Sequence, residues 1–132
     1  MTTTAVVMFD GETRPDDPGP SAIGDIVETD DWTEEGSKHI GESTNNRTEY
    51  RALIQGLELA SRQGCTKVEA RGDPEVIVKQ VRGVYGVNQP ELRPLRNRVQ
   101  ELADEFEKFE IQYIPREENW EADELVDQAF SE

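Results

Sequence analysis

Four carboxylates stand where a folded chain could bring them together. Asp10 ends an apolar run, and Asp73 ends the short run KVEARG. Glu49 and Asp123 each border the apolar stripe of an expected helix. If these elements converge, their like charges are tolerable only around cations, and hard oxygen ligands suit Mg²⁺ or Mn²⁺. Two such ions about 3.5–4 Å apart catalyse in-line displacement at phosphorus.

Each acid also has a simpler explanation. Asp10 could begin a turn, and Asp73 could be only the N-cap of a helix. Glu49 could be a capping-box partner of Asn46, and Asp123 could be a solvated acid at a helix edge. Because 29 residues are acidic, most of them must lie on a solvated face. The choice therefore depends on whether the elements that carry the four acids converge.

The first part of the chain has the pattern of an antiparallel meander. Apolar runs predict strands at 3–11, 21–28 and 37–43. Turn-forming residues at 15–20 and acidic residues at 29–36 separate these runs. Three consecutive strands with short connections favour antiparallel pairing between neighbours.

The rest of the chain alternates helices with strands. Helical spacing of Tyr50, Leu53 and Leu57 marks the change of period. The expected elements are a helix at 48–64, a strand at 66–73, helices at 74–83 and 89–106, a strand at 108–115 and a helix at 119–130. The order β-β-β-α-β-α-α-β-α over residues 1–132 predicts a single α/β domain, with helices on the faces of a mixed sheet.

Composition narrows the class of protein. A single cysteine, Cys65, excludes an intrachain disulfide and fits a reducing cytoplasm. The N-terminal residues lack the charged region of a signal peptide, and no run approaches the roughly 18 apolar residues of a membrane span. We therefore expect a soluble, cytoplasmic protein without a membrane partner.

The net charge of −15 is extreme for 132 residues. Such a chain repels itself in dilute salt, and molar salt screens that repulsion. Disorder is the other interpretation of an acidic chain, but the apolar periodicity argues against it. The composition therefore favours a folded protein from a high-salt cytoplasm.

Four segments resemble type 1 ribonuclease H, in the right order: FDG, TNNRTEYRALIQGLELA, GDPEVIVKQVRG and ENWEADELV. The resemblance covers nearly the whole chain. Within the family, the sequence resembles short archaeal and halophilic members. It implies the ribonuclease H-like fold, with a mixed five-stranded sheet of three antiparallel strands and parallel additions. It also implies an endonuclease that hydrolyses the RNA strand of RNA–DNA hybrids with two Mg²⁺ or Mn²⁺ ions. We expect a monomer with no obligate protein partner.

The resemblance also assigns roles to particular residues. The catalytic and metal-binding acids that it implies are Asp10, Glu49, Asp73 and Asp123. The substrate-binding residues that it implies are Gly11, Thr44, Asn45, Asn46 and Arg47. The two asparagines would meet base edges and 2′-hydroxyls, and Thr44 would hold a phosphate of the DNA strand. Turn and capping chemistry is the other explanation for adjacent asparagines before a helix. Further possible contributors are Lys79, Arg82, Arg116, Glu118 and Asn119.

Two features depart from the family pattern. The usual GDS is GDP here, which leaves the carboxylate intact. Bacterial members often carry a His before the last acid, whereas the loop IPREEN has none, and His39 belongs to the third expected strand. In its place, Arg116 or Glu118 could help with metal exchange or product release. We expect a bare catalytic domain, without a separate hybrid-binding domain.

An enzyme with a net charge of −15 would repel nucleic acid, so it needs a local cluster of positive charge to bind the phosphates. Residues 76–100 hold five cations and one acid, an excess of four positive charges around Tyr85. Family members often hold the DNA strand with the corresponding region, although a solvated helix face explains the pattern equally well.

Two other functions stay open at this point. The same fold could carry a metal-independent phosphatase or a nuclease for another substrate class, although the lack of a His pair argues against histidine phosphatase chemistry. Alternatively, the protein could be an acidic, non-enzymatic DNA mimic that binds basic partners. A mimic would need neither TNNRTE nor ADEL.

Overall fold

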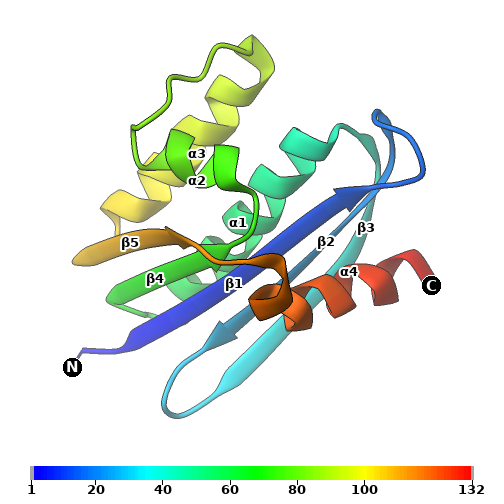
Figure 1. Cartoon of the computed structure of the whole chain (residues 1–132). Coiled ribbons are helices and arrows are strands. Elements are labelled where there is room, and N and C mark those ends of the chain that lie inside the picture. The colour runs from blue at the N-terminus through cyan, green and yellow to red at the C-terminus, as the bar shows by residue number, and fades with distance from the viewer. Residues whose placement is uncertain (1, 132) are drawn as a thin grey trace.

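The computed structural model describes residues 2–131, and five strands form one mixed sheet (Figure 1). The strands are β1 (Thr4–Thr13), β2 (Gly19–Glu28), β3 (Thr33–Ser43), β4 (Lys67–Gly72) and β5 (Lys108–Tyr113). Their order in the sheet is β3-β2-β1-β4-β5. The first three pair antiparallel, and β4 and β5 extend the sheet in parallel from β1. The predicted sheet is confirmed.

Helices cover both faces of this sheet (Figure 1). They are α1 (Asn45–Arg62), α2 (Glu75–Val81), α3 (Arg93–Asp104) and α4 (Trp120–Ser131), with short 3₁₀ helices η1 (Pro90–Leu92) and η2 (Arg116–Asn119) before α3 and α4. The first three helices lie on one face, and α4 crosses the other. Among the described residues, none of the helices has the length and apolar character to cross a membrane.

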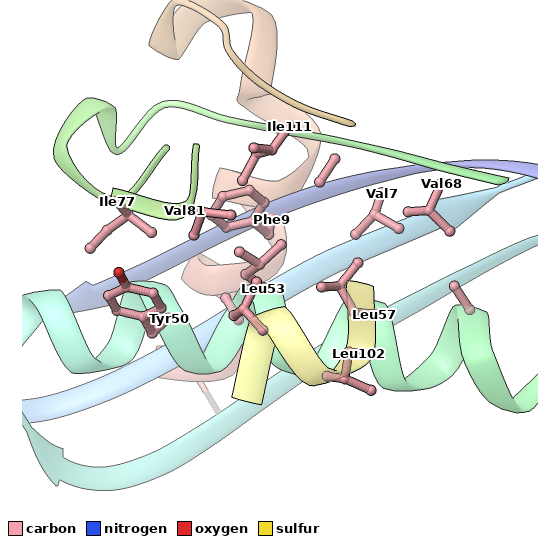
Figure 2. Packing of buried hydrophobic residues seen from close by; sticks show 14 of the residues in the cluster. Val7, Phe9, Tyr50, Leu53, Leu57, Val68, Ile77, Val81, Leu102 and Ile111 are labelled. Carbon is pink, nitrogen blue, oxygen red and sulfur yellow. The ribbon is translucent and has the colours of Figure 1, made fainter. Parts of the chain in front are cut away.

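The period of two along the strands divides the buried residues between the faces. Val7 and Phe9 of β1 pack against Leu53 and Leu57 of α1 in the main core (Figure 2). On the opposite face, Ala22 of β2 packs with residues of α4 in a smaller cluster. The main core fixes α1 against β1, and the smaller cluster fixes α4 against β2.

Several element boundaries differ from the predicted ones. β2 begins at Gly19 and β3 at Thr33, because backbone pairing of Gly19 with Ser43 and of Glu28 with Thr33 extends the ladder into both expected turns. α1 begins at Asn45, three residues early, because Thr44 is its N-cap.

The second helix also begins differently. Pro74 has an extended backbone, with ψ at 91°, so α2 begins at Glu75 and Asp73 is not its N-cap. The prediction that Pro74 is the first helical residue is therefore wrong. The carboxylate of Asp73 has no capping duty at α2.

Candidate active site

Asp10 and Asp73 meet where two parallel strands separate. The pairing of β1 with β4 ends at Phe9 opposite Gly72, so the next residue of each strand is an acid. β1 itself does not end there, because it stays paired with β2 as far as Thr13. The explanation of Asp10 as the start of a turn is therefore wrong. At this point the ladder opens, and two carboxylates occupy the gap.

Glu49 joins these two acids from the second turn of α1. A pocket of about 310 Å³ is lined by Asp10, Gly11, Glu12, Asn45, Glu49, Asp73, Pro74, Tyr113 and Arg116. Three of the four acids selected from the sequence therefore share one cavity. Asp10 is 5% exposed, so its carboxylate lies at the bottom of this pocket.

Asp123 reaches the same place from α4. Carboxylate oxygens of Asp10, Glu12 and Asp123 all lie within 4.8 Å of one another. Asp10 thus belongs both to the pocket and to this acidic triad. Glu12 was not selected from the sequence, although it lies two residues beyond Asp10 and so shares its face of the strand.

Asn45 holds Glu49 in place at the start of α1. Its amide nitrogen donates to Oε1 of Glu49 at 3.0 Å, and its amide oxygen accepts from the backbone N–H of Thr13 at 3.2 Å. The side chain thus connects the helix, the acid and β1. Thr44, rather than Asn46, caps the helix by accepting from the N–H of Arg47 at 3.3 Å. The capping-box explanation of Glu49 is therefore wrong.

Gly11 allows this close approach of β1 and α1. A Cβ at Gly11 would lie 2.6 Å from the carbonyl oxygen of Thr48, which is helix backbone and cannot move aside alone. A side chain here would push α1, and Glu49 with it, away from Asp10. The glycine therefore has a packing reason as well as its expected place beside the substrate.

Arg116 is the cation of the pocket, among the residues that the structure describes. One of its terminal nitrogens lies 3.1 Å from Glu12 and 3.4 Å from Asp123. Asn119 is buried and donates to the carbonyl of Phe9 at 2.9 Å, which fastens η2 to β1 beside Asp10. Glu118 is exposed and does not line the acid pocket in the described part of the chain. Of the two loop residues considered, only Arg116 is in the site.

The site disfavours negative charge when no cation is bound. Burial, then the charges of Asp73 and Glu12, raise the pKa of Asp10 to about 9. Burial, then Asp73, raise the pKa of Glu49 to about 8, although the Asn45 hydrogen bond opposes the shift. Burial also raises the pKa of Asp73, against the nearby amide of Asn119 and guanidinium of Arg116. A hard divalent cation fits this donor set, because it would stabilise the ionised carboxylates.

These pKa values predict an unusual pH dependence for the metal-free protein. Asp10 and Glu49 ionise near pH 4 in the unfolded chain and near pH 9 and 8 in the folded one. Between these values the folded state binds more protons, so the contribution of these two acids to stability is fully present below about pH 4 and is lost as pH rises through 8 and 9. Melting temperatures in EDTA from pH 5 to 9 should decrease, and less steeply in Asp10→Asn. A rising melting temperature over this range would contradict the crowded-acid interpretation.

Comparison with known proteins places this geometry in a family. The family model described as reverse transcriptase-like matches residues 8–129. The crystal structure of RNase H1 from the halophilic archaeon Halobacterium salinarum is 38% identical, with a TM-score of 0.92 over 97% of this chain and 98% of that one. The chain belongs to the type 1 ribonuclease H family. The predicted family and the ribonuclease H-like fold are both confirmed.

Other ribonuclease H relatives agree. The N-terminal RNase H domain of a Mycobacterium tuberculosis protein has a TM-score of 0.93 at 34% identity, covering 98% of this chain and 95% of that one. LC11-RNase H1, solved in complex with an RNA/DNA hybrid, has a TM-score of 0.87 at 38% identity, covering 95% of each. Ribonuclease HI of H. salinarum is 40% identical over 126 residues, which is 94% of this chain and 63% of that protein. The chain thus spans under two thirds of the length of that curated relative.

The expected substrate-binding residues divide into two groups. Gly11 and Asn45 line the acid pocket, whereas Thr44, Asn46 and Arg47 lie at the start of α1 and are not among its described lining residues. The amide of Asn46 is 3.5 Å from that of Gln89. Lys79 and Arg82 do not line this pocket either, in the described part of the chain.

The basic segment at residues 76–100 has fewer unpaired cations for binding nucleic acid than its charge suggests. Lys79 forms an ion pair with Glu75 at 2.8 Å, and Arg98 contacts both Glu58 and Glu101. Arg82 lines a separate pocket of about 660 Å³ along β5. Part of the local positive excess is therefore neutralised within the fold.

Proposed function

We propose that this protein is an endonuclease that hydrolyses the RNA strand of RNA–DNA hybrids with two Mg²⁺ or Mn²⁺ ions. The observation that carries the proposal is the convergence of Asp10, Glu49 and Asp73 on one pocket, with Asp123 in the triad around Asp10. These four acids would hold the ions. Bound ions of this kind polarise the phosphate and supply a nucleophilic water at neutral pH.

The chain's own groups prepare the site for that chemistry. Asn45 orients Glu49, so its amide is already engaged and is a positioning group as much as a substrate contact. Thr44, Asn46 and Arg47 remain candidates for the hybrid backbone and its 2′-hydroxyls. The hybrid complex of the LC11 relative supports a hybrid as the substrate class. Arg116, close to the acids, is the residue best placed to assist metal exchange or product release.

The decisive experiment compares substrates and metals directly. Labelled RNA–DNA hybrid, duplex DNA and duplex RNA are incubated with the protein in Mg²⁺, Mn²⁺ or EDTA. We expect cleavage of the RNA strand of the hybrid alone, and only with metal. Cleavage of duplex DNA or RNA would indicate another substrate class, and no cleavage together with tight binding to basic proteins would favour a DNA mimic. A monomer of one domain, in the cytoplasm, is part of the same proposal.

His39 should be dispensable for cleavage. It is exposed on β3, its Nδ1 accepts from the N–H of Gly41 at 3.2 Å, and its ring meets the ring of Phe130 edge-on at 5.7 Å. These contacts are those of a packing residue. We expect His39→Ala to cleave within a few-fold of wild type, with an unchanged pH–rate curve. A loss on the order of 100-fold would instead indicate a lost general acid–base group.

A further inference from the structure

Asp25 is a buried acid outside the active site. It lies in the middle of β2, between the core residues Ile23 and Val27, and none of its surface is exposed. Its Oδ2 accepts from the side-chain amide of Gln55 on α1 at 2.6 Å. Its Oδ1 has no hydrogen-bond partner among the residues that the structure describes. A buried carboxylate oxygen without a partner is costly, so the position calls for a ligand.

A cavity opens directly over this carboxylate. It has a volume of about 430 Å³ and is lined by Asp25, Glu34, Glu35, Gly36, Ser37, Lys38, Gln55, Leu59 and Arg62. Asp25 is not among the described residues that line the acid pocket around Asp10, so the two cavities are separate. Asp25 therefore lies at the floor of a second cavity, between α1 and β3, with its unpartnered oxygen covered in the structure.

Gly36 lies directly against the carboxylate. It pairs with Asp25 across the β2–β3 ladder. A Cβ at Gly36 would lie 3.0 Å from Oδ1 and 3.1 Å from Oδ2 of Asp25, and 2.6 Å from the Gln55 amide nitrogen. A side chain at position 36 would therefore displace Gln55 and press on both carboxylate oxygens.

The charges around the cavity favour a cation. Burial raises the pKa of Asp25 to about 7, the Gln55 hydrogen bond lowers it, and the charge of Glu34 raises it. Lys38 and Arg62 line the cavity, but neither forms an ion pair with Asp25 in the described structure. A bound cation would stabilise the ionised carboxylate in a way that these side chains do not.

We propose that Asp25 binds one alkali cation, Na⁺ or K⁺, in this cavity, with Oδ1 as its anionic ligand. The amide of Gln55 carries a neutral oxygen next to its donating nitrogen, and Glu34 adds a second negative charge nearby. One carboxylate with neutral and water oxygens is a weakly charged donor set. Such a set suits a monovalent ion better than a divalent ion, which is typically held by several carboxylates.

The test measures unfolding in matched salts with EDTA present, so that the acid pocket binds no divalent metal. Melting temperatures are compared in KCl, NaCl and choline chloride at the same molar concentration. Wild type should melt higher in an alkali salt than in choline chloride, by a shift on the order of 5 °C. Asp25→Asn, which keeps the size of the side chain, should lose this difference.

A matched control removes one acid elsewhere. Asp30→Asn changes an exposed residue between β2 and β3 and should keep the alkali-specific shift. Equal melting temperatures of wild type in all three salts would overturn the proposal and indicate a neutral, protonated Asp25. An alkali-specific shift that persists in Asp25→Asn would overturn it too, because the ion would then bind elsewhere.

A direct binding measurement on wild type does not depend on the variant folding. The ²³Na resonance should broaden in the presence of the protein, and K⁺ should reverse the broadening by competition. Glu34→Gln should weaken the competition several-fold, whereas Lys38→Met should leave it intact or strengthen it. Broadening that is the same in Asp25→Asn and Asp30→Asn would reflect only the net charge and would refute the site.

Discussion

Asp10→Asn should abolish hybrid cleavage, by a factor on the order of 10³ or more, while leaving the protein folded. The amide keeps the shape of the buried side chain but removes the charge shared by the pocket and the acidic triad. In EDTA the same variant should melt at a higher temperature than wild type at pH 8, because wild-type Asp10 is ionised in the unfolded chain and must bind a proton to be buried, whereas the amide needs none. Cleavage rates with Mn²⁺ and melts in EDTA measure both effects.

The other acids give graded expectations. Glu49→Gln and Asp73→Asn should lose activity as severely as Asp10→Asn, and Asp123→Asn should show a large but smaller loss. Asp104→Asn, at the exposed end of α3, serves as the charge-matched control and should cleave normally. Near-wild-type turnover in Asp10→Asn, Glu49→Gln or Asp73→Asn would remove that residue from the site.

The melting temperature of wild type should rise steeply between 0.1 M and 3 M KCl, by an amount on the order of 10 °C. The cause is screening of the repulsion among 29 acids that only 14 cations offset. This general effect should also appear, somewhat reduced, in choline chloride. Thermal melts followed by circular dichroism would measure it.

Stabilisation by a divalent metal tests the repulsion among the crowded acids independently of bulk salt. At 0.1 M salt, Mg²⁺ should raise the melting temperature of wild type by binding the folded site, and it should do so less in Asp10→Asn. A melting temperature that stays flat or falls toward 3 M KCl would contradict the interpretation of the acidic surface as an adaptation to high salt.

The positions of Asp10 and Asp73 could be predicted because each follows a segment with a strand pattern, an apolar run before Asp10 and the alternating KVEARG before Asp73. Parallel strands bring such residues to the same edge, and the register of β1 with β4 does so here. Glu12 could not be selected in the same way, since one acid among 29 carries no signal of its own. Its place in the triad depends on how α4 and η2 dock against β1, which local patterns do not encode.

Other differences have equally specific causes. Asn45 was expected at the substrate, but its amide is engaged between Glu49 and Thr13, a tertiary arrangement that no spacing indicates. Asp25 did carry a signal, because it occupies the core-facing phase of β2 between Ile23 and Val27. The early starts of β2 and β3 arise from cross-strand pairing, which overrides the turn preference of acidic and proline-rich sequence.

The pairing of β1 on both its edges has a mechanical consequence for Asp10. The acid belongs to the central strand. It pairs directly with β2 and lies one residue beyond the end of the ladder with β4, so backbone pairing rather than an adjustable loop sets its position. Slippage of that strand by one residue would turn Phe9 toward the acid pocket and send Asp10 into the hydrophobic interior. The geometry of the site thus depends on the rigidity of the sheet. Substitutions that repack the interior around Phe9 would shift Asp10 and lower activity, although they change none of the four acids.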